Sequence, residues 1–336
     1  MIERMVDLKP YNTFGISANA SEFTRFNSTA ELRSILNVNK GKDLLILGGG
    51  SNLLLTKDVD QLVLRNEIKG IELVKEDTEN YYVKAGAGEV WHEFVMHCVD
   101  NNYGGVENLS FIPGSVGASP MQNIGAYGVE IKDVFHELEA MHIATGELHH
   151  FDVASCEFGY RESVFKRKFK NQYVICSVTF RLSKNHRINS TYGAINSELE
   201  KLGITDPTIK DISNAVIAIR SSKLPNPAEI GNAGSFFKNP VVEMEVLEKI
   251  IVSYPDAPFF PTTEHRKVKL AAGWLIEKAG WKGFSEGNYG VHKLQALVLV
   301  NYGGSTGQQI YDLSSRIIAD IEDKFGVTLE REVNIL

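Results

Sequence analysis

Residues 104–128 are rich in glycine, serine, proline and asparagine, and their apolar side chains follow almost no regular period. Helices and half-buried strands need such a period, so the sequence predicts a long irregular loop here. Loops of this length in a compact chain usually carry function. The run I-P-G-S-V-G-A-S-P-M-Q-N-I-G-A-Y-G at 112–128 suggests backbone wrapped around a flat or phosphorylated ligand. An irregular surface loop is the alternative.

A second glycine-rich segment is L-I-L-G-G-G-S-N at 45–52, where a short buried strand at 43–47 runs into three glycines. Consecutive glycine N–H groups can form a nest that binds an anion, and Ser51 and Asn52 add donors for a phosphate. A simple tight turn is the alternative. The spacing matches neither G-x-G-x-x-G nor a Walker loop, so neither a Rossmann nor a P-loop fold is predicted.

A third segment reads G-N-A-G-S-F-F-K-N-P at 231–240. Its glycines and alanine allow a backbone to approach a ligand closely. Ser235 presents a hydroxyl, which in a dry pocket can donate a proton or anchor a hydrogen bond. The segment is not the G-x-S-x-G elbow of a hydrolase, because Phe237 occupies the position of the closing glycine.

Two cationic segments could bind anionic groups. In F-G-Y-R at 158–161, the Arg161 guanidinium could clamp a carboxylate or stabilise developing negative charge. In I-R-S-S-K-L-P at 219–225, Arg220 and Lys223 could bind a diphosphate together with Tyr192 of T-Y-G. A surface arginine and a solvated helix end are the respective alternatives.

One histidine pattern needs a geometric check. His92, Glu93 and His97 resemble the zinc motif H-E-x-x-H, but the second histidine falls one residue late. At 100° per residue, helix positions five apart point about 140° away from each other. We therefore expect no zinc-protease site here.

Composition narrows the class of protein. The 336 residues favour two or three domains, and the net charge of −7 argues against binding a nucleic-acid backbone. The three cysteines are scattered and indicate neither a disulfide framework nor a zinc site. The first residues lack the apolar run of a signal peptide, and no stretch approaches the roughly 20 apolar residues that span a bilayer. We expect a cytoplasmic protein without a membrane partner.

Apolar periodicity and capping signals predict the regular elements. The predicted helices follow the capping box Ser28-x-x-Glu31 and the pair Ser305-x-x-Gln308, and lie at about 89–101, 211–220, 242–253 and 268–279. The predicted strands lie at 43–47, 173–182 and 296–300, with alternation at 328–335.

Together these segments resemble the UDP-N-acetylenolpyruvoylglucosamine reductase family, from N-T-F-G-I at 12–16 to L-E-R-E-V at 329–333. The three glycine-rich segments, F-G-Y-R, S-S-K-L-P and Q-A-L-V-L-V-N occur in the family's order, and T-Y-G at 191–193 resembles its longer form with a tyrosine loop. The resemblance implies an α+β fold, with an FAD-binding fold of the vanillyl-alcohol oxidase type followed by a C-terminal α/β substrate domain. The implied boundaries are 1–70 and 71–224 for two FAD-binding subdomains, 225–325 for the substrate domain, and 326–336 for a strand that returns to the first.

The resemblance also assigns roles residue by residue. The catalytic candidates are Arg161, Ser235 and Glu332. The positions that match flavin-contacting segments are Gly48, Gly49, Gly50, Ser51, Asn52, Pro113, Gly114, Ser119, Ile124, Gly125 and Arg220. The positions that match contacts to the UDP-sugar are Tyr127, Tyr192, Lys223, Asn239 and Gln295.

The implied activity is the NADPH-dependent reduction of the enolpyruvyl ether of UDP-N-acetylglucosamine to UDP-N-acetylmuramate, a peptidoglycan precursor. Non-covalent FAD would pass a hydride to the methylene carbon, Arg161 would stabilise charge on the carboxylate, and Ser235 would protonate the α carbon. A charged carboxylate would repel the enolate, so we expect Glu332 to be protonated through burial or neutralised by Arg161 or Arg331. We also expect a monomer whose partner is the UDP-sugar.

Three other functions stay open from the residues. A flavin oxidase of the same fold often links FAD through histidine or cysteine, and the segments 48–52 and 112–128 contain neither. A nucleotide-sugar hydrolase or transferase could use Ser235 as nucleophile, with His265 and His292 as remote bases. A non-catalytic nucleotide-binding module is the third alternative.

Overall fold

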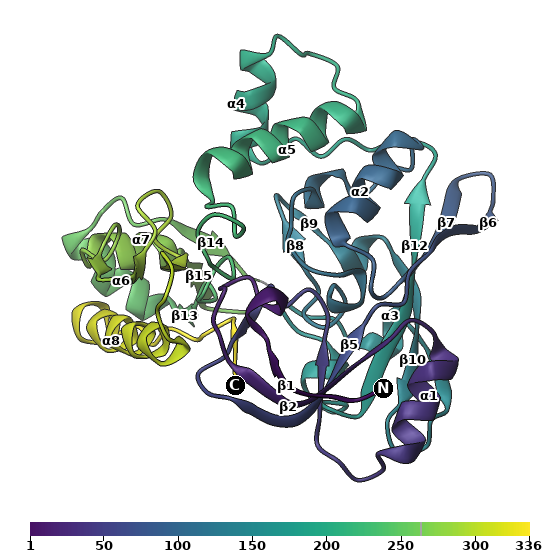
Figure 1. The fold of residues 1–336 in the computed structure, drawn as a ribbon. Helices are drawn as coiled ribbons and strands as arrows, with labels where there is room; N and C mark the ends of the chain where they lie inside the picture. Colours follow the sequence, from purple (N-terminus) through teal and green to yellow (C-terminus); the bar gives the residue numbers. More distant parts are fainter. Residues whose placement is uncertain (263) are drawn as a thin grey trace. The chain divides into compact units, whose positions relative to one another are not determined.

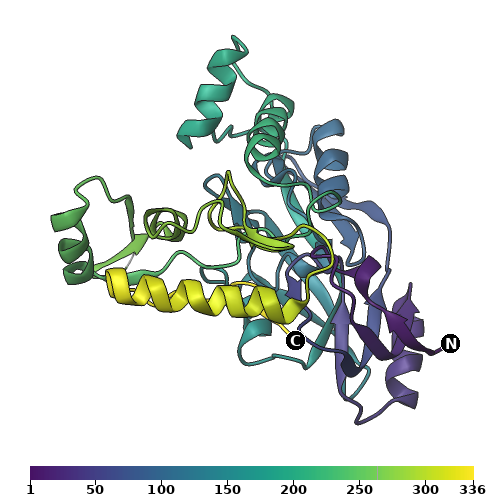
Figure 2. The ribbon, with the colours of Figure 1, turned by 60° about the vertical axis from the view of Figure 1, so that its left-hand side comes forward.

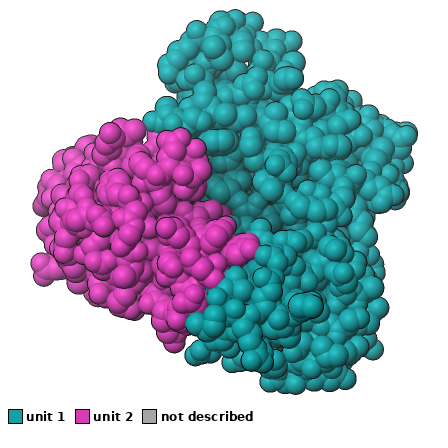
Figure 3. All heavy atoms as spheres, viewed as in Figure 1, with its two compact units in different colours: residues 1–6, 20–49, 60–222 teal, residues 7–19, 50–59, 223–336 magenta. Residues whose placement is uncertain are grey.

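The computed structural model describes residues 1–262 and 264–336. Its backbone divides into two compact units, each assembled from several stretches of the chain. Unit 1 consists of residues 1–6, 20–49 and 60–222, and unit 2 of residues 7–19, 50–59 and 223–336 (Figure 3). The finer three-part boundaries implied by the resemblance stay a prediction.

The smaller sheet of unit 1 has four strands, and one helix packs against it. Its strand order is β1 (Glu3–Asp7), β2 (Asn19–Phe26), β5 (Val59–Asn66) and β3 (Leu44–Leu47). β3 and β5 run parallel, with Leu44 beside Leu62. Helix α1 (Thr29–Val38) contributes Leu32 and Leu36 to an apolar core shared with Leu62 and Leu64 of β5. The predicted strand at 43–47 is confirmed, but only Leu47 is buried, so its burial was overestimated.

The start of α1 confirms the capping signal at Ser28. The Ser28 hydroxyl accepts a hydrogen bond from the Glu31 N–H at 3.2 Å. The Glu31 carboxylate reaches back to the N–H of Asn27 at 2.9 Å, one residue earlier than a standard capping box. These two bonds satisfy donors that the helix itself leaves unpaired.

The larger sheet of unit 1 is antiparallel throughout (Figure 1). Its strand order is β11 (Leu148–Asp152), β10 (Phe135–His142), β12 (Tyr173–Ser183), β7 (Asn80–Gly86) and β6 (Ile71–Glu76). Helix α2 (Trp91–Asp100) packs on it, and the rings of Trp91 and Phe94 lie 5.7 and 4.8 Å from that of Phe180 in β12. The predicted helix at 89–101 and strand at 173–182 are confirmed to within two residues.

The rest of unit 1 contains short elements and a pair of helices. The short elements are β8 (Gly125–Ala126), β9 (Val129–Glu130) and α3 (Val153–Cys156). Helices α4 (Gly193–Lys201) and α5 (Ile209–Lys223) pack through Ile195, Leu199, Ile212 and Val216. The predicted loop at 104–128 is confirmed, since it holds only β8 and two single 3₁₀ turns, at 107–109 and 116–118.

Within its described residues, unit 2 contains three small sheets and three α-helices. The sheets are β13 (Val241–Glu243), β15 (Lys267–Leu270) and β14 (Phe259–Pro261); β16 (Ser285–Glu286), β17 (Tyr289–Val291) and β18 (Leu299–Asn301); and the parallel pair β4 (Leu53–Leu54) and β19 (Asn334–Ile335). The helices are α6 (Met244–Ser253), α7 (Ala272–Lys278) and α8 (Gly307–Phe325).

Three predictions in unit 2 need correction. The helix expected at 268–279 begins only at Ala272, because Val268 and Leu270 are buried on one face of strand β15. The strand expected at 296–300 is shifted to β18. The alternation at 328–335 buries Leu329 and Val333 as expected, but regular strand pairing is confined to residues 334–335 and one bridge at Arg331.

Helix α8 is amphipathic, as its 3.6-residue period predicts, and is the longest helix of unit 2 (Figure 2). The buried stripe consists of Ile310, Leu313, Ile317, Ile321 and Phe325. The predicted capping pair was wrong by one residue: the Thr306 hydroxyl accepts from the Gln309 N–H, and the Gln309 side-chain oxygen Oε1 accepts from the Thr306 N–H. Ser305 is unsuited to this role because its hydroxyl is buried and donates to Asn301 at 2.7 Å.

The cap of α8 gives a direct stability prediction. Replacing Thr306 by alanine removes the hydroxyl acceptor and should lower the free energy of unfolding by about 0.5–2 kcal/mol. Chemical denaturation followed by circular dichroism measures this. Gln308→Ala is the matched control, because Gln308 is exposed and bonds only along the helix to Asp312. Equal losses in both variants would contradict the observed cap.

Candidate functional site

The two glycine-rich segments predicted to contact a cofactor lie against each other within unit 1. A Cβ atom added to Gly49 would lie 2.9 Å from the Cα of Gly114, and one added to Gly48 would lie 2.5 Å from the Oγ of Ser115. At Gly49 the obstacle is backbone, so a side chain there would force the two segments apart, whereas at Gly48 it is a serine hydroxyl, which can rotate away. The turn after β3 and the start of the loop at 113–115 therefore form one continuous surface of backbone.

Backbone hydrogen bonds hold the loop in place beside α2. The Trp91 N–H donates to the Gly114 carbonyl at 3.0 Å, and the Val116 N–H donates to the Glu89 carbonyl at 2.9 Å. Farther along, Ser119 is buried and its hydroxyl donates to the Val116 carbonyl at 2.7 Å. The Ile124 N–H in turn donates to the Ser119 carbonyl at 3.1 Å. The predicted cofactor residues of this loop thus belong to a backbone that is held by hydrogen bonds.

Arg161 is tied to the same loop. Its guanidinium donates to the Gly125 carbonyl at 2.6 Å, so this catalytic candidate and one cofactor candidate are in direct contact. Arg161 follows Tyr160 in a two-residue turn closed by Gly159 and Glu162, and its φ is +55°. Positive φ at the second central position of a turn favours glycine or asparagine. A left-handed arginine is therefore a strained feature, of the kind found at functional sites.

Tyr127, Tyr192 and Arg220 form a second cluster in unit 1. Tyr127 and Gly128 are the two turn residues between β8 and β9, and both have positive φ, as in a type I′ hairpin. The Tyr127 side chain hydrogen-bonds with Arg220, and its ring lies 5.3 Å from that of Tyr192 in an edge-to-face arrangement. Burial raises the pKa of the Tyr127 phenol, and the nearby Arg220 charge opposes this shift.

In unit 2 the Ser235 segment pairs with the segment that carries Glu332. The Glu332 N–H donates to the Phe236 carbonyl at 2.8 Å, and the Lys238 N–H donates to the Glu330 carbonyl at 2.9 Å. Phe236 itself is fully buried, whereas Ser235 is exposed, and the predicted role of Ser235 stays a prediction. These bonds pair the two backbone segments that carry the catalytic candidates of unit 2.

Asn52 joins these catalytic candidates. Its amide donates to the Glu332 carbonyl at 3.3 Å, and its own carbonyl accepts from the amide of Asn334 at 2.9 Å. Ser51 precedes it at the start of the same turn. A residue predicted to contact the cofactor therefore borders the ladder that joins Ser235 to Glu332.

Close backbone contacts fix the ends of this region. A Cβ on Gly231 would lie 2.1 Å from the Phe14 carbonyl, and a Cβ on Gly50 would lie 2.0 Å from that of Tyr11. The Asn301 side chain also donates to the Phe14 carbonyl, at 2.8 Å. The segment at 11–14 thus anchors both glycine turns of unit 2.

Three predicted substrate residues have mainly local contacts. Lys223 is exposed at the end of α5. The Asn239 side-chain oxygen accepts from the Ala272 N–H at 3.0 Å and so caps α7. The Gln295 side-chain oxygen lies 3.4 Å from the Leu297 N–H, which donates to it. These contacts leave their predicted role in binding the UDP-sugar untested.

Two residues that the sequence reasoning did not assign also shape the site. Asn123 is fully buried with φ +44°, and its amide donates to the Gly159 carbonyl at 3.0 Å, which links the loop to the Arg161 turn. Asn232 accepts from the Gly234 N–H at 3.0 Å and so fixes the turn before Ser235. Asparagine tolerates left-handed backbone and bonds to nearby backbone groups, and that property was the available signal.

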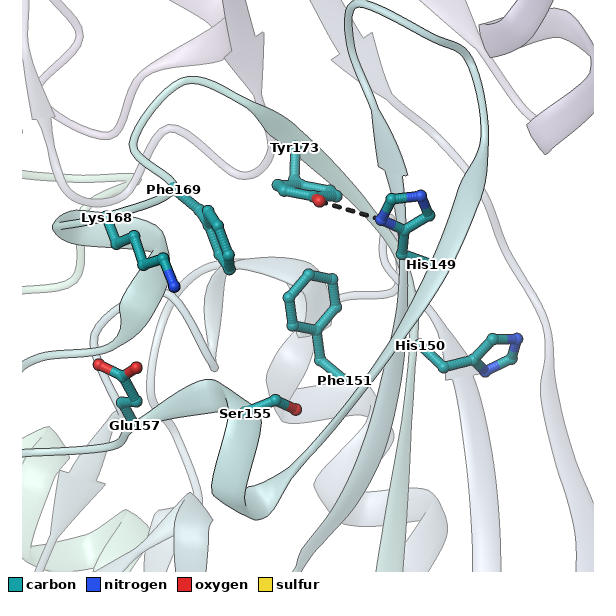
Figure 4. Close-up of a pocket in the computed structure, with 8 residues that line it drawn as sticks. All are labelled: His149, His150, Phe151, Ser155, Glu157, Lys168, Phe169 and Tyr173. Atoms are coloured by element: carbon teal, nitrogen blue, oxygen red, sulfur yellow. Dashed lines mark hydrogen bonds between the residues drawn. The ribbon is translucent and has the colours of Figure 1, made fainter.

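One surface hollow of about 600 Å³ belongs to unit 1 but contains none of the predicted site residues (Figure 4). Its lining consists of His149, His150, Phe151, Ser155, Glu157, Lys168, Phe169 and Tyr173. Tyr173 and His149 hydrogen-bond at 2.9 Å (Figure 4), the Ser155 hydroxyl donates to the Asp152 carboxylate at 2.6 Å, and Glu157 pairs with Arg167. We assign no ligand to this hollow.

The backbone surface of unit 1 fits the phosphates of a bound FAD. The glycine run and the 113–115 loop meet backbone to backbone at Gly49 and Gly114, two residues without a Cβ atom. Successive backbone N–H groups in a glycine turn favour an anion. Within residues 1–262 and 264–336, no group of histidine, cysteine and carboxylate side chains is arranged to hold a metal ion. In the same residues, no helix is long and apolar enough to cross a membrane.

Gly49 gives a prediction for this surface. Its φ is ordinary, so Gly49→Ala acts only through the contact with Gly114, where the added methyl must displace backbone. We expect the free energy of unfolding to fall by about 1–3 kcal/mol and FAD affinity to weaken. Denaturation and fluorescence titration with FAD measure both. Gly193→Ala is the control, because a Cβ there meets nothing within 4 Å. Unchanged FAD affinity in Gly49→Ala would remove this turn from the cofactor site.

Sequence comparison identifies two family regions in the chain. The family model for the UDP-N-acetylenolpyruvoylglucosamine reductase C-terminal domain matches residues 226–336. The model for an FAD-binding domain matches residues 21–152. The second region contains both glycine-rich segments of the unit 1 surface.

Whole-chain relatives agree with these matches. A UDP-N-acetylenolpyruvoylglucosamine reductase from Flavobacterium johnsoniae is 52% identical, and the match covers 100% of this chain and 99% of the relative. The enzyme of the same name from Pseudomonas syringae pv. tomato is 51% identical over 99% of this chain and 98% of the relative. The crystal structure of the Thermus caldophilus reductase has a TM-score of 0.69 at 23% identity, and covers 100% of this chain and 98% of that one. The predicted α+β fold, an FAD-binding fold followed by a C-terminal domain, is confirmed.

Proposed function

Because the chain belongs to the UDP-N-acetylenolpyruvoylglucosamine reductase family, we propose that it reduces the enolpyruvyl ether of UDP-N-acetylglucosamine to UDP-N-acetylmuramate. The product is a precursor of peptidoglycan. The proposal includes non-covalent FAD as cofactor, NADPH as electron donor, and a monomer that acts in the cytoplasm.

One observation carries the assignment of residues. The hydrogen bond from the Glu332 N–H to the Phe236 carbonyl, at 2.8 Å, joins the Ser235 segment to the Glu332 segment. Asn52 donates to the carbonyl of the same Glu332. Asn52 and Glu332, which are 280 positions apart in the chain, thus lie together, which supports the proposed site.

The residues that would hold FAD are the glycine turn at 48–50 with Ser51 and Asn52, and the loop positions Pro113, Gly114, Ser119, Ile124 and Gly125. Backbone N–H groups of the glycine turn and of Gly114 would bind the phosphates, which needs no positively charged side chain. When bound, FAD supplies the hydride that the methylene carbon of the substrate receives.

Arg161 would stabilise the charge that develops on the substrate carboxylate. Addition of a hydride to the methylene carbon moves electron density to the α carbon and into the carboxylate. A guanidinium beside that group binds the transition state more strongly than the ground state, which accelerates the reaction. The bond from Arg161 to the Gly125 carbonyl would hold the guanidinium in position for this role.

Ser235 would give a proton to the α carbon. A hydroxyl is a weak acid, but the electron-rich α carbon is a strong base, so the transfer is chemically adequate. The side chain is exposed on unit 2, where the substrate can reach it. Asn232 would support this role, because its bond to the Gly234 N–H fixes the preceding turn.

Glu332 would act in its protonated form. A charged carboxylate near the reacting carbon would oppose the build-up of negative charge. The contacts of Arg331 do not favour its pairing with the neighbouring Glu332. The Arg331 guanidinium donates to Ser314 and Ser315 at 2.7 and 2.6 Å and lies over the Tyr311 ring. Neutralisation by Arg161 stays the alternative to a Glu332 that carries its own proton.

The nucleotide end of the substrate would be bound by the remaining predicted residues. The Tyr127 and Tyr192 rings supply aromatic faces, and Tyr127 also bonds to Arg220, which the resemblance places among the flavin contacts. Lys223, Asn239 and Gln295 complete the proposed set. Aromatic and cationic groups together suit a uridine diphosphate.

The experiment that tests the proposal is product analysis with the purified protein, NADPH and the enolpyruvyl UDP-sugar. We expect one UDP-N-acetylmuramate for each NADPH oxidised, identified by mass spectrometry. Release of UDP or of a free sugar without NADPH oxidation would support a hydrolase or transferase instead. NADPH oxidation that consumes oxygen and leaves the sugar unchanged would support an oxidase.

A further inference from the structure

Phe111 lies at a strained point of the loop in unit 1. Its φ of +59° is in the left-handed region, which a residue with a Cβ adopts only at a conformational cost. Two residues later the chain reaches Pro113 and Gly114, the first proposed FAD contacts of the loop. The backbone direction at Phe111 therefore determines where these contacts begin.

Side chains from two helices hold both polar backbone groups of Phe111. Its N–H donates to Nδ1 of His92, in the first turn of α2, at 3.0 Å. Its carbonyl accepts from Nε of Arg220, in α5, at 3.0 Å. The imidazole also meets the Phe111 ring edge to face, with centroids 5.4 Å apart. Strained backbone persists where its surroundings over-determine it, as they do here.

The flanking residues are held by groups that do not titrate near neutral pH. The Trp91 indole donates to the Leu109 carbonyl at 2.9 Å, and the Trp91 N–H donates to the Gly114 carbonyl at 3.0 Å. The Ser110 hydroxyl hydrogen-bonds with that of Ser213 in α5 at 2.8 Å. Among these contacts to residues 109–114, His92 supplies the acceptor that a single proton removes.

We propose that His92 is a positioning residue of the FAD site. As a neutral imidazole it accepts the Phe111 N–H, keeps Phe111 left-handed, and so fixes Pro113 and Gly114 where FAD would contact them. The inference rests on the proposed function for the identity of the ligand, but the hydrogen bond from the Phe111 N–H to His92 does not depend on that function. His92 acts through the loop and touches no reacting atom.

The charges around His92 favour this neutral form. Burial lowers the pKa of His92 most, the Arg220 charge from α5 lowers it further, and Glu93 on its own helix raises it. The loop residue that faces His92 is Phe111, which carries no charge. A protonated imidazole carries N–H groups on both nitrogens and cannot accept the bond. Because the folded-state pKa of His92 lies below the ordinary value of about 6.5, the hydrogen bond from the Phe111 N–H is complete above about pH 6.5 and is lost as the pH falls through the lowered pKa.

The test uses three variants of the flavin-free protein and of the FAD-loaded protein. His92→Leu removes the acceptor, His92→Asn keeps an acceptor near the Nδ1 position but does not titrate, and His97→Leu controls for loss of a histidine from the same helix. Hydrogen exchange of residues 109–114 without FAD measures how firmly His92 holds the loop at Phe111. Fluorescence titration with FAD, from about pH 7.5 down to about pH 5, reports its effect on the cofactor.

We expect faster exchange of residues 109–114 in His92→Leu, and wild-type exchange in His92→Asn and His97→Leu. FAD affinity should fall about tenfold in His92→Leu, which corresponds to about 1.4 kcal/mol. Acid should weaken FAD binding more in the wild type than in His92→Asn. If His92→Leu does not fold, the comparison of acid sensitivity between the wild type and His92→Asn still tests the proposal.

Two results would overturn the proposal: unchanged exchange of residues 109–114 in a folded His92→Leu, or equal acid sensitivity in the wild type and His92→Asn. A protein that binds no FAD but shows the exchange difference would contradict the proposed function and leave the grip of His92 on Phe111 standing.

Discussion

Ser235→Ala should lower turnover of the enolpyruvyl UDP-sugar by about 10²–10⁴-fold while NADPH still reduces the flavin at the wild-type rate. The methyl group cannot donate a proton, so the substrate half-reaction loses its acid, whereas electron transfer from NADPH does not use this hydroxyl. Because Ser235 is exposed, its removal should leave the free energy of unfolding nearly unchanged. Stopped-flow absorbance under anaerobic conditions measures the two half-reactions separately.

Ser253→Ala serves as the control for this experiment, because Ser253 is an exposed serine of the same unit at the end of α6. It should retain both half-reactions. If Ser235→Ala lost both half-reactions together, Ser235 would hold the cofactor or the fold rather than supply a proton. If it retained both, another group would be the acid.

Replacing Arg161 by alanine should lower turnover by about 10²–10³-fold, the usual loss when one group that stabilises developing negative charge is removed. The loss should appear in kcat more than in KM, because the charge grows only in the transition state. FAD affinity should also weaken, since the bond to the Gly125 carbonyl is lost. Steady-state kinetics and FAD titration measure these effects.

Two further variants separate chemistry from stability. Arg161→Gly should be as inactive as Arg161→Ala but at least as stable, because glycine relieves a left-handed φ that costs other residues about 1–2 kcal/mol. Arg167→Ala should keep its activity, because Arg167 is exposed and pairs on the surface with Glu157. Full activity in Arg161→Ala would require another cation at the substrate carboxylate.

Much of the fold follows from local patterns. The Ser28 cap and the periodicities of α2, β12 and α8 depend on residues close in the sequence, and these predictions are confirmed. The cap of α8 could not be predicted to the residue, because Ser305 and Thr306 are both good caps. Tertiary structure decides between them: Asn301 binds the Ser305 hydroxyl. Strand β15 was missed although K-V-K-L alternates, since the apolar run that follows extends the helical pattern.

The candidate site divides in the same way. The glycine segments predict a close approach of backbone, and the structure confirms such an approach between Gly49 and Gly114. The bonds of Arg220 and His92 to Phe111 were unpredictable, because Arg220 is 109 positions from Phe111 and His92 is 19 away. Nothing in one sequence reveals which backbone group a distant side chain will reach. The sequence showed His92 only as a failed zinc ligand.

The measurement that tests the central claim most directly is the anaerobic visible spectrum of the FAD-loaded protein through one catalytic cycle. NADPH should bleach the flavin absorbance, and one equivalent of the enolpyruvyl UDP-sugar should then restore it without oxygen. Recovery of colour only on admission of oxygen, or a purified protein that cannot retain FAD at all, would contradict the assignment.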